Sequence, residues 1–134
     1  MNIETLRVFL KYGDWANGQL INAAKGLSDC QLSEKFEMGR GNLRKTLLHI
    51  WAGESVWVSR WQERTETPWP DEDEVVPVSA IGEQLAEVYG GRDAFVSTLC
   101  DGDLSRVVTY RDSKGSLFKA TLGDMIVQMI VHST

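Results

Sequence analysis

The segment Gly41–Gln62, GNLRKTLLHIWAGESVWVSRWQ, decides the fold of this 134-residue chain. Its apolar residues recur at spacings of three, four and seven, as one buried face of an α-helix requires. They are Leu43, Leu47, Ile50, Trp57 and Trp61. Asn42 directly precedes the run and is a favourable N-cap residue. We therefore expect a long amphipathic helix that packs its apolar face against other helices.

Three more helices are predicted by the same periodicity. The first runs from Asn2 to about Lys25, and the third runs from Ser79, a second N-cap candidate, to Cys100. The last begins at Ala120 or Thr121 and continues to the end of the chain. The chain has the length of one domain, so we expect residues 1–134 to form a single all-α, four-helix bundle.

The segments between these helices differ in character. Residues Leu27–Arg40 lack periodicity and are expected to form a loop. The segment after Gln62 contains three prolines and the acidic run Asp71–Glu74, which predicts a long, solvated connection between the second and third helices. Residues Asp101–Lys119 hold β-favouring residues on both sides of a Ser-Lys-Gly turn, which indicates a short hairpin or two extended arms before the last helix.

Composition excludes several classes of protein. The chain has 14 basic and 19 acidic residues, a net charge of -5, and no cluster of Lys and Arg among aromatics, so we expect no nucleic-acid binding. No apolar run approaches the roughly 20 residues that span a bilayer, so we expect no membrane insertion. Cys30 and Cys100 show no CxxC spacing and fit a reducing compartment. These observations together predict a cytoplasmic protein.

The two histidines of the chain are candidate metal ligands. His49 lies at the edge of the apolar stripe of the second helix, and His132 has the same position on the last helix. Imidazoles on facing helices are compatible with a metal site in a bundle core. A catalytic metal usually takes three protein ligands, however, so the residues alone leave two interpretations open. The histidines either bind a metal or are hydrogen-bonded residues at the edge of the core.

Glu54 is the candidate catalytic residue because its carboxylate falls within the apolar stripe of the second helix. A buried carboxylate must be paired or have a raised pKa. It would then accept a hydrogen bond from a ligating histidine or act as a general base beside a bound water. The alternative is a structural role, in which Glu54 reaches a backbone donor or an arginine such as Arg7 or Arg44.

Four segments of the chain resemble the DinB/YfiT family. They are YGDWANGQLINAAKGL in the first helix, LLHIWAGESVWVSRWQ in the second, VTYRDSKGSLFKATLGDMI leading into the last helix, and the closing VHST. The resemblance runs along nearly the whole chain. It implies an up-down-down-up four-helix bundle with a long connection between the second and third helices, and it implies a homodimer.

The resemblance also implies a metal site. Members of the family hold a divalent metal, zinc or nickel, with three histidines, one on the second helix and an HxxxH pair on the last. His49 matches the first of these positions, and His132 matches the first member of the pair. The third would fall two residues beyond Thr134, so we expect the last helix to be truncated in this sequence.

The activity that the resemblance implies is metal-dependent chemistry on small molecules. Members with known activity resemble thiol-dependent transferases and isomerases, along with metal-dependent hydrolases. The metal would activate a water or a low-molecular-weight thiol by lowering its pKa. Our leading hypothesis is therefore a metal-dependent transferase or hydrolase with a small-molecule substrate. The alternative is a non-catalytic bundle that binds a small molecule or dimerises and whose histidines are structural.

Overall fold

The computed structural model describes residues 2–64 and 68–133, and these are mostly helical. The elements in chain order are α1 (Ile3–Ala24), α2 (Asp29–Ser33), α3 (Leu43–Trp61), α4 (Val78–Val96), the 3-10 helix η1 (Asp101–Ser105), β1 (Val107–Arg111), β2 (Leu117–Thr121) and α5 (Leu122–His132). The four longer helices correspond to the four that periodicity predicts.

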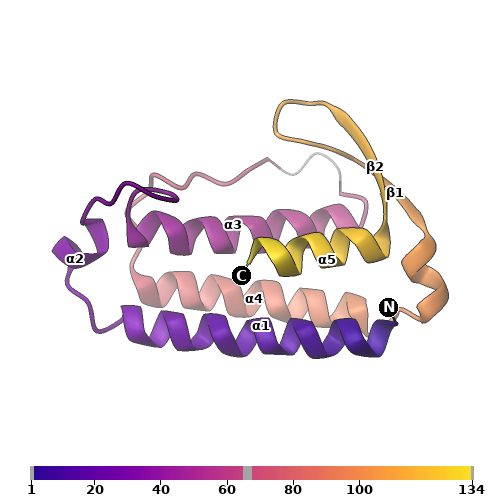
Figure 1. Cartoon of the computed structure of the whole chain (residues 1–134), viewed down its shortest axis with the longest axis horizontal. Coiled ribbons are helices and arrows are strands. Elements are labelled where there is room, and N and C mark those ends of the chain that lie inside the picture. Colours follow the sequence, from indigo (N-terminus) through magenta and orange to yellow (C-terminus); the bar gives the residue numbers. More distant parts are fainter. Residues whose placement is uncertain (1, 65–67, 134) are drawn as a thin grey trace.

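The four longer helices pack side by side. Figure 1 shows that α1 and α5 run in one direction and that α3 and α4 run in the other. Helix α3 packs against α4 and α5, and α1 packs against the same two helices. Helices α1 and α3 therefore face each other across the molecule, with α4 and α5 between them. Residues 68–77, which lead into α4, return along α3, so that α3 and α4 begin at the same end (Figure 1).

Three helix starts follow from side-chain caps. Asn2 accepts a hydrogen bond from Thr5 N at the start of α1, and Asn42 accepts one from Lys45 N at the start of α3. Thr121 does the same at the start of α5. Each cap satisfies a backbone donor that has no partner within the helix. The expected N-cap at Asn42 and the expected start near Thr121 are confirmed.

The expected bounds of α4 were wrong at both ends. Pro77, not Ser79, holds the N-cap position, and α4 begins at Val78. The helix ends at Val96 rather than at Cys100. The hydroxyls of Ser97 and Thr98 donate to the carbonyl oxygens of Ala94 and Phe95, at 2.7 and 2.6 Å. Such local side-chain bonds compete with the helical hydrogen bonds, which accounts for the earlier end.

The segment Leu27–Arg40 is not entirely a loop, because it contains α2. Ser28 accepts from Gln31 N, and the Gln31 side chain accepts from the Ser28 backbone. This reciprocal capping box stabilises a single helical turn that is too short to show a periodic apolar stripe. Leu32 of this turn is buried.

The predicted hairpin before the last helix is confirmed. Strands β1 and β2 pair antiparallel, with Val108 opposite Ala120. Tyr110 of β1 packs against Trp57 of α3 with the ring centroids 5.5 Å apart. The Arg60 guanidinium lies 4.8 Å from the Trp57 ring centroid and 5.0 Å from that of Tyr110. These contacts anchor the hairpin on the end of α3 and direct the chain into α5.

The core consists of two apolar clusters with polar side chains between them. One cluster contains Leu10 of α1, Trp57 of α3 and Val96 of α4, together with most of the buried face of α5. The other lies toward the opposite ends of the helices and includes Ile21, Leu48 and Leu85. The buried polar residues Asn17, Glu54 and Arg92 fall between these positions on α1, α3 and α4. A polar layer therefore crosses the interior.

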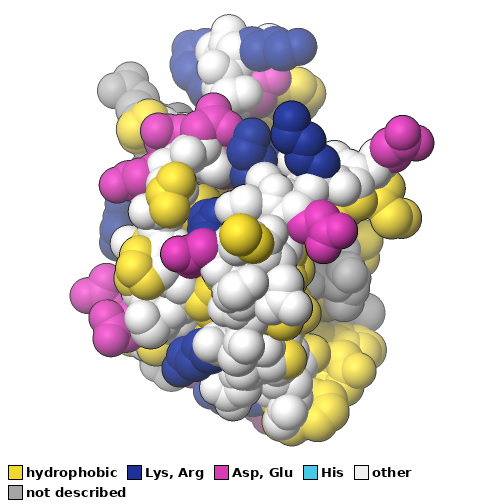
Figure 2. All heavy atoms as spheres, turned by 90° about the vertical axis from the view of Figure 1, so that its left-hand side faces the viewer, with side chains coloured by type: hydrophobic (Ala, Val, Ile, Leu, Met, Phe, Trp, Pro, Cys, Tyr) yellow, Lys and Arg dark blue, Asp and Glu magenta, His cyan; other side chains and the backbone are white. Residues whose placement is uncertain are grey.

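One face of α1 carries apolar side chains that the fold leaves exposed. They are Val8, Phe9, Tyr12, Trp15 and Leu20. Figure 2 shows hydrophobic side chains gathered at the lower right of the molecule, at the level of α1, while acidic side chains gather on the opposite side. In the part of the chain that the structure describes, every helix is too short or too polar to cross a bilayer.

Candidate metal and ligand site

The structure brings the two histidines together. His49 of α3 and His132 of α5 place their Nε2 atoms 3.0 Å apart, and their ring centroids are separated by 4.7 Å. Gly53, one helical turn after His49, provides the space that this approach needs. A Cβ atom at Gly53 would lie 2.3 Å from Cε1 of His132. The absence of a side chain at Gly53 therefore permits the contact between the two imidazoles.

We predict that Gly53→Ala separates the histidines. Alanine normally stabilises a helix interior by about 1 kcal/mol relative to glycine. The contact of 2.3 Å instead forces the His132 ring to move, and overpacking of this kind costs about 1–3 kcal/mol. Denaturant unfolding measures the change in stability. The imidazole NMR shifts report the movement of the His132 ring away from His49. Gly90→Ala in α4 is the matched control, because its Cβ would meet nothing within 4 Å. Equal stabilisation by both substitutions would contradict the prediction.

The connection between α3 and α4 covers His49. The Glu72 carboxylate contacts Nδ1 of His49, and an Arg40 guanidinium nitrogen lies 2.8 Å from Nδ1 and 3.1 Å from Nε2. Trp69 donates from Nε1 to Glu72 at 3.2 Å, and its ring centroid lies 5.6 Å from that of His49. A carboxylate at Nδ1 favours the tautomer with its proton on Nδ1. In that tautomer the lone pair of His49 Nε2 faces both the Arg40 guanidinium and His132.

His132 is held as a neutral imidazole. Burial is the main cause that lowers its pKa, electrostatic interaction with His49 and Arg40 lowers it further, and Glu72 raises it. Its Nδ1 is buried and has no hydrogen-bond partner among the described residues. A neutral imidazole is the form that ligates metals, but the nitrogen of His132 that faces His49 is Nε2, not the unpartnered Nδ1.

The two histidines fit a metal ion as a pair of ligands. Zn–N bonds measure about 2.0–2.1 Å, so two nitrogens on a tetrahedral ion are about 3.3 Å apart. The observed 3.0 Å needs only a small outward shift. Glu72 fits the outer carboxylate that commonly orients a ligating histidine. Within residues 2–64 and 68–133, no group of three His, Cys, Asp or Glu side chains is arranged to hold an ion.

Glu54 belongs to the polar layer and interacts with Ser133, the residue that follows His132. Its side chain is 4 % exposed, and Oε2 has no hydrogen-bond partner among the described residues. Burial raises the pKa of Glu54 to about 7, against a smaller lowering by Ser133 and Arg92. Arg92 NH1 lies 4.0 Å from Oε2.

Glu54 does lie near an arginine, but this arginine is neither Arg7 nor Arg44. Arg7 donates to the carbonyl oxygen of Val96 at 3.1 Å, and Arg44 reaches Asp29 at 3.4 Å. The nearby arginine is Arg92, on a helix that follows α3 only after the long connection. Sequence proximity does not reveal a contact between helices, because that contact depends on how the two helices are rotated against each other.

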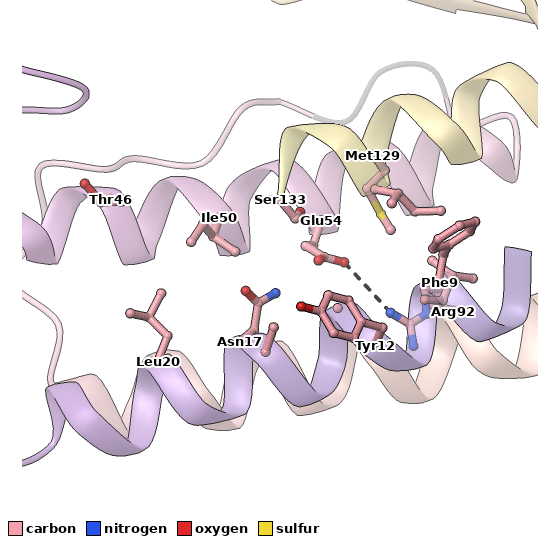
Figure 3. A pocket seen from close by; sticks show the side chains of 14 residues that line it. Phe9, Tyr12, Asn17, Leu20, Thr46, Ile50, Glu54, Arg92, Met129 and Ser133 are labelled. Atoms are coloured by element: carbon pink, nitrogen blue, oxygen red, sulfur yellow. Dashed lines mark ion pairs between the residues drawn. The ribbon is translucent and has the colours of Figure 1, made fainter.

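Glu54 faces a cavity of about 660 Å³. Its walls come from α1, α3, α4 and the end of α5, and the residues are Phe9, Leu10, Tyr12, Gly13, Ala16, Asn17, Leu20, Thr46, Ile50, Glu54, Arg92, Met129, Ile130 and Ser133. Figure 3 shows Glu54 and Arg92 pointing toward one another across this space, with Tyr12 and Asn17 on the α1 side. His49 and His132 are not among the residues that line the cavity.

Sequence reasoning missed Arg92 and Glu72. Arg92 was detectable, because it continues the apolar stripe of α4 seven residues after Leu85 and four before Val96. A charged residue in such a stripe must find a buried partner. Glu72 carried no comparable signal, since it lies within an acidic run that is typical of a solvated segment.

Comparison with known proteins agrees with the resemblance seen in the sequence. Residues 13–134 match the model of the DinB superfamily. The structure is similar to the crystal structure of a DinB-like protein from Bacillus cereus, with a TM-score of 0.75 and 20% identity over 98% of this chain and 83% of the other. A comparison with curated proteins found no match. At 20% identity the likeness shows the fold alone, but the family model spans most of the sequence, and the chain therefore belongs to the DinB superfamily.

Proposed function

We propose that this DinB-superfamily protein is a metal-dependent enzyme, a transferase or hydrolase acting on small molecules. The scaffold would be an up-down-down-up four-helix bundle, and a divalent ion, zinc or nickel, would be held by His49 and His132 between α3 and α5. The observation that carries the proposal is the 3.0 Å separation of the two Nε2 atoms, which belong to residues 83 positions apart in the chain.

The residues around the metal site would each have a different role. A bound ion supplies Lewis acidity, which lowers the pKa of a coordinated water or low-molecular-weight thiol. Glu72 would keep the proton of His49 on Nδ1, and Trp69 would shield the histidine pair from solvent. Glu54 would serve as the general base for a substrate in the cavity, because its pKa of about 7 suits proton transfer near neutral pH.

Metal content tests the proposal. Elemental analysis of the purified protein, followed by titration with zinc and nickel, should give about one ion per chain. His49→Ala and His132→Ala should each lose that ion. Cys30→Ala is the control, because Cys30 is an exposed potential ligand away from the site. A chain that binds neither metal, or whose histidine variants bind as well as the wild type, would refute the metal site.

We further predict that Glu72→Gln weakens metal binding by about 10–100-fold, the usual effect of losing an outer-shell partner. The amide no longer enforces the Nδ1–H tautomer of His49. Calorimetric titration measures the affinity, and imidazole ¹⁵N shifts report the tautomer without metal. Glu74→Gln, in the same acidic run but exposed, should bind as the wild type does. Indistinguishable affinities for the two variants would argue against a role for Glu72.

The alternative function is a non-catalytic bundle that binds a small molecule or dimerises, with structural histidines. The contacts of His49 with Glu72 and Arg40 favour it, since they satisfy the ring without a metal.

In either case we propose a homodimer through the exposed apolar face of α1, where Trp15 is 60% exposed. Sedimentation should show a dimer in the wild type and a monomer in Trp15→Glu. A wild type that stays monomeric at high concentration would exclude the dimer.

A further inference from the structure

Four of the five N–H donors of Arg92 are committed to carboxylates other than Glu54. Its NH1 and NH2 atoms donate to the two carboxylate oxygens of Asp14, at 2.7 and 2.6 Å. NH2 and Nε also donate to Asp93, at 2.8 and 3.2 Å. Lys11 donates to the other oxygen of Asp93 at 2.7 Å. Asp14 and Asp93 therefore balance the charges of Arg92 and Lys11.

Glu54 is the third carboxylate of this cluster and is not balanced. Two cations, Arg92 and Lys11, stand against three carboxylates, those of Asp14, Asp93 and Glu54. The 4.0 Å separation between Glu54 Oε2 and Arg92 is too long for a hydrogen bond. A buried acceptor without a hydrogen bond costs free energy. A ligand that donates a hydrogen bond to Glu54 would remove this cost on binding.

The cavity in front of Glu54 suits a ligand with an apolar body. Its volume of about 660 Å³ is within the usual range for small-molecule sites. Leu10, Ile50 and Met129 provide aliphatic walls, and Phe9 and Tyr12 add aromatic rings. Aromatic faces attract cations as well as apolar groups. Among the residues that the structure describes, no lysine lines the cavity and Arg92 is the one arginine that does.

We propose that this cavity binds a small organic cation, a protonated amine on an apolar body, with the ammonium group at Glu54. The ammonium would supply the missing donor and balance the third carboxylate. A carboxylate ligand would instead meet the carboxylate of Glu54, while four of the five N–H donors of Arg92 are occupied. A neutral alcohol would fill the apolar space but leave the charge of Glu54 unbalanced. The assignment of such an amine as the substrate rests on the proposed function, whereas its binding does not require a metal.

Three ligands of equal chain length test the proposal. Hexylamine, hexanol and hexanoate would be titrated into the ¹⁵N-labelled full chain at about pH 8, where the amine is protonated and Glu54, with a pKa of about 7, is ionised. Chemical shift changes then give three dissociation constants. We expect hexylamine to bind at least about tenfold more tightly than hexanol, because a charge-assisted hydrogen bond is added to the same apolar contacts. Hexanoate should bind more weakly than hexanol.

Two variants test whether the carboxylate of Glu54 causes the tighter binding of hexylamine than of hexanol. Glu54→Gln keeps the shape of the side chain and should reduce the affinity for hexylamine to that for hexanol. Glu87→Gln is the matched control, because Glu87 is an exposed carboxylate on α4 outside the cavity. It should retain the preference for the amine.

The outcomes separate this inference from the metal site. Equal affinity for hexylamine and hexanol, tighter binding of hexanoate, or unchanged amine binding in Glu54→Gln would each overturn it. The comparison of ligands on the unsubstituted chain decides the question even if Glu54→Gln does not fold. His49→Ala should still prefer the amine. An amine preference without metal binding would refute the proposed function alone, and metal binding without an amine preference would refute this inference alone.

Discussion

Replacing Arg92 with methionine is expected to lower the free energy of unfolding by about 3–5 kcal/mol, the range for breaking a buried ion pair by removing one partner. Arg92 is fully buried, and its hydrogen bonds to Asp14 and Asp93 raise its pKa despite the opposing effect of burial. Methionine fills much of the volume but leaves Asp14 and Glu54 without the nearby positive charge. Denaturant unfolding followed by circular dichroism measures the loss.

A double variant and an exposed control make the result specific. Adding Asp14→Asn to Arg92→Met removes the stranded carboxylate and should recover part of the lost stability, since residues in one network are not additive. Arg106→Met removes an exposed arginine and should change stability by no more than about 0.5 kcal/mol. If Arg92→Met costs no more than Arg106→Met, the buried charge cluster does not stabilise the fold.

Glu54→Gln is expected to stabilise the protein, and by more as the pH rises. The pKa of Glu54 is raised from 4.5 to about 7 by burial, so the folded state holds its proton more tightly than the unfolded chain does. Below pH 4.5 both states are protonated and folding costs nothing extra at this site. Above pH 7 both are ionised, and the shift corresponds to about 3 kcal/mol of lost stability. The wild type therefore loses this stability as the pH rises from 4.5 to about 7.

The measurement compares wild type and Glu54→Gln at two pH values. The variant should be more stable by about 1 kcal/mol at pH 5 and by about 3 kcal/mol at pH 8. Other titrating groups cancel in the difference. Glu87→Gln, on the exposed face of α4, should show no such pH dependence. A difference that is the same at both pH values would mean that Glu54 is not strained by burial. A gain in stability with a loss of ligand binding would be a common trade-off at functional sites.

The predicted and observed folds agree where local signals act. Apolar periodicity located the four longer helices, and Asn42 was correctly predicted to cap α3. The mispredicted start of α4 was also local in origin, because Ser79 and Pro77 are both acceptable near a helix start. α2 was missed because one capped turn carries no periodicity. The DinB resemblance, read from segments of the sequence, is confirmed by the family model.

The candidate site was only partly predictable. The histidines were identified because their positions at stripe edges and the family resemblance agreed. The roles of Glu72, Trp69 and Arg40 around His49 depend on how the connection folds back over α3, and no spacing in the sequence encodes that path. The sequence suggested an arginine such as Arg7 or Arg44 as one possible partner of Glu54, but it did not indicate that the nearby arginine would be Arg92 of α4.

The sequence by itself determined the helical class, the position of the main helices, the superfamily and the residues with unusual chemistry. These depend on interactions within about four residues along the chain, such as stripes and caps. Only the tertiary structure decided that His49 meets His132 and that Glu54 faces a cavity, not lined by the histidines, beside an Arg92 that is bonded to Asp14 and Asp93. Those facts depend on the rotation and register of helices that are far apart in sequence, which many side chains set together through packing.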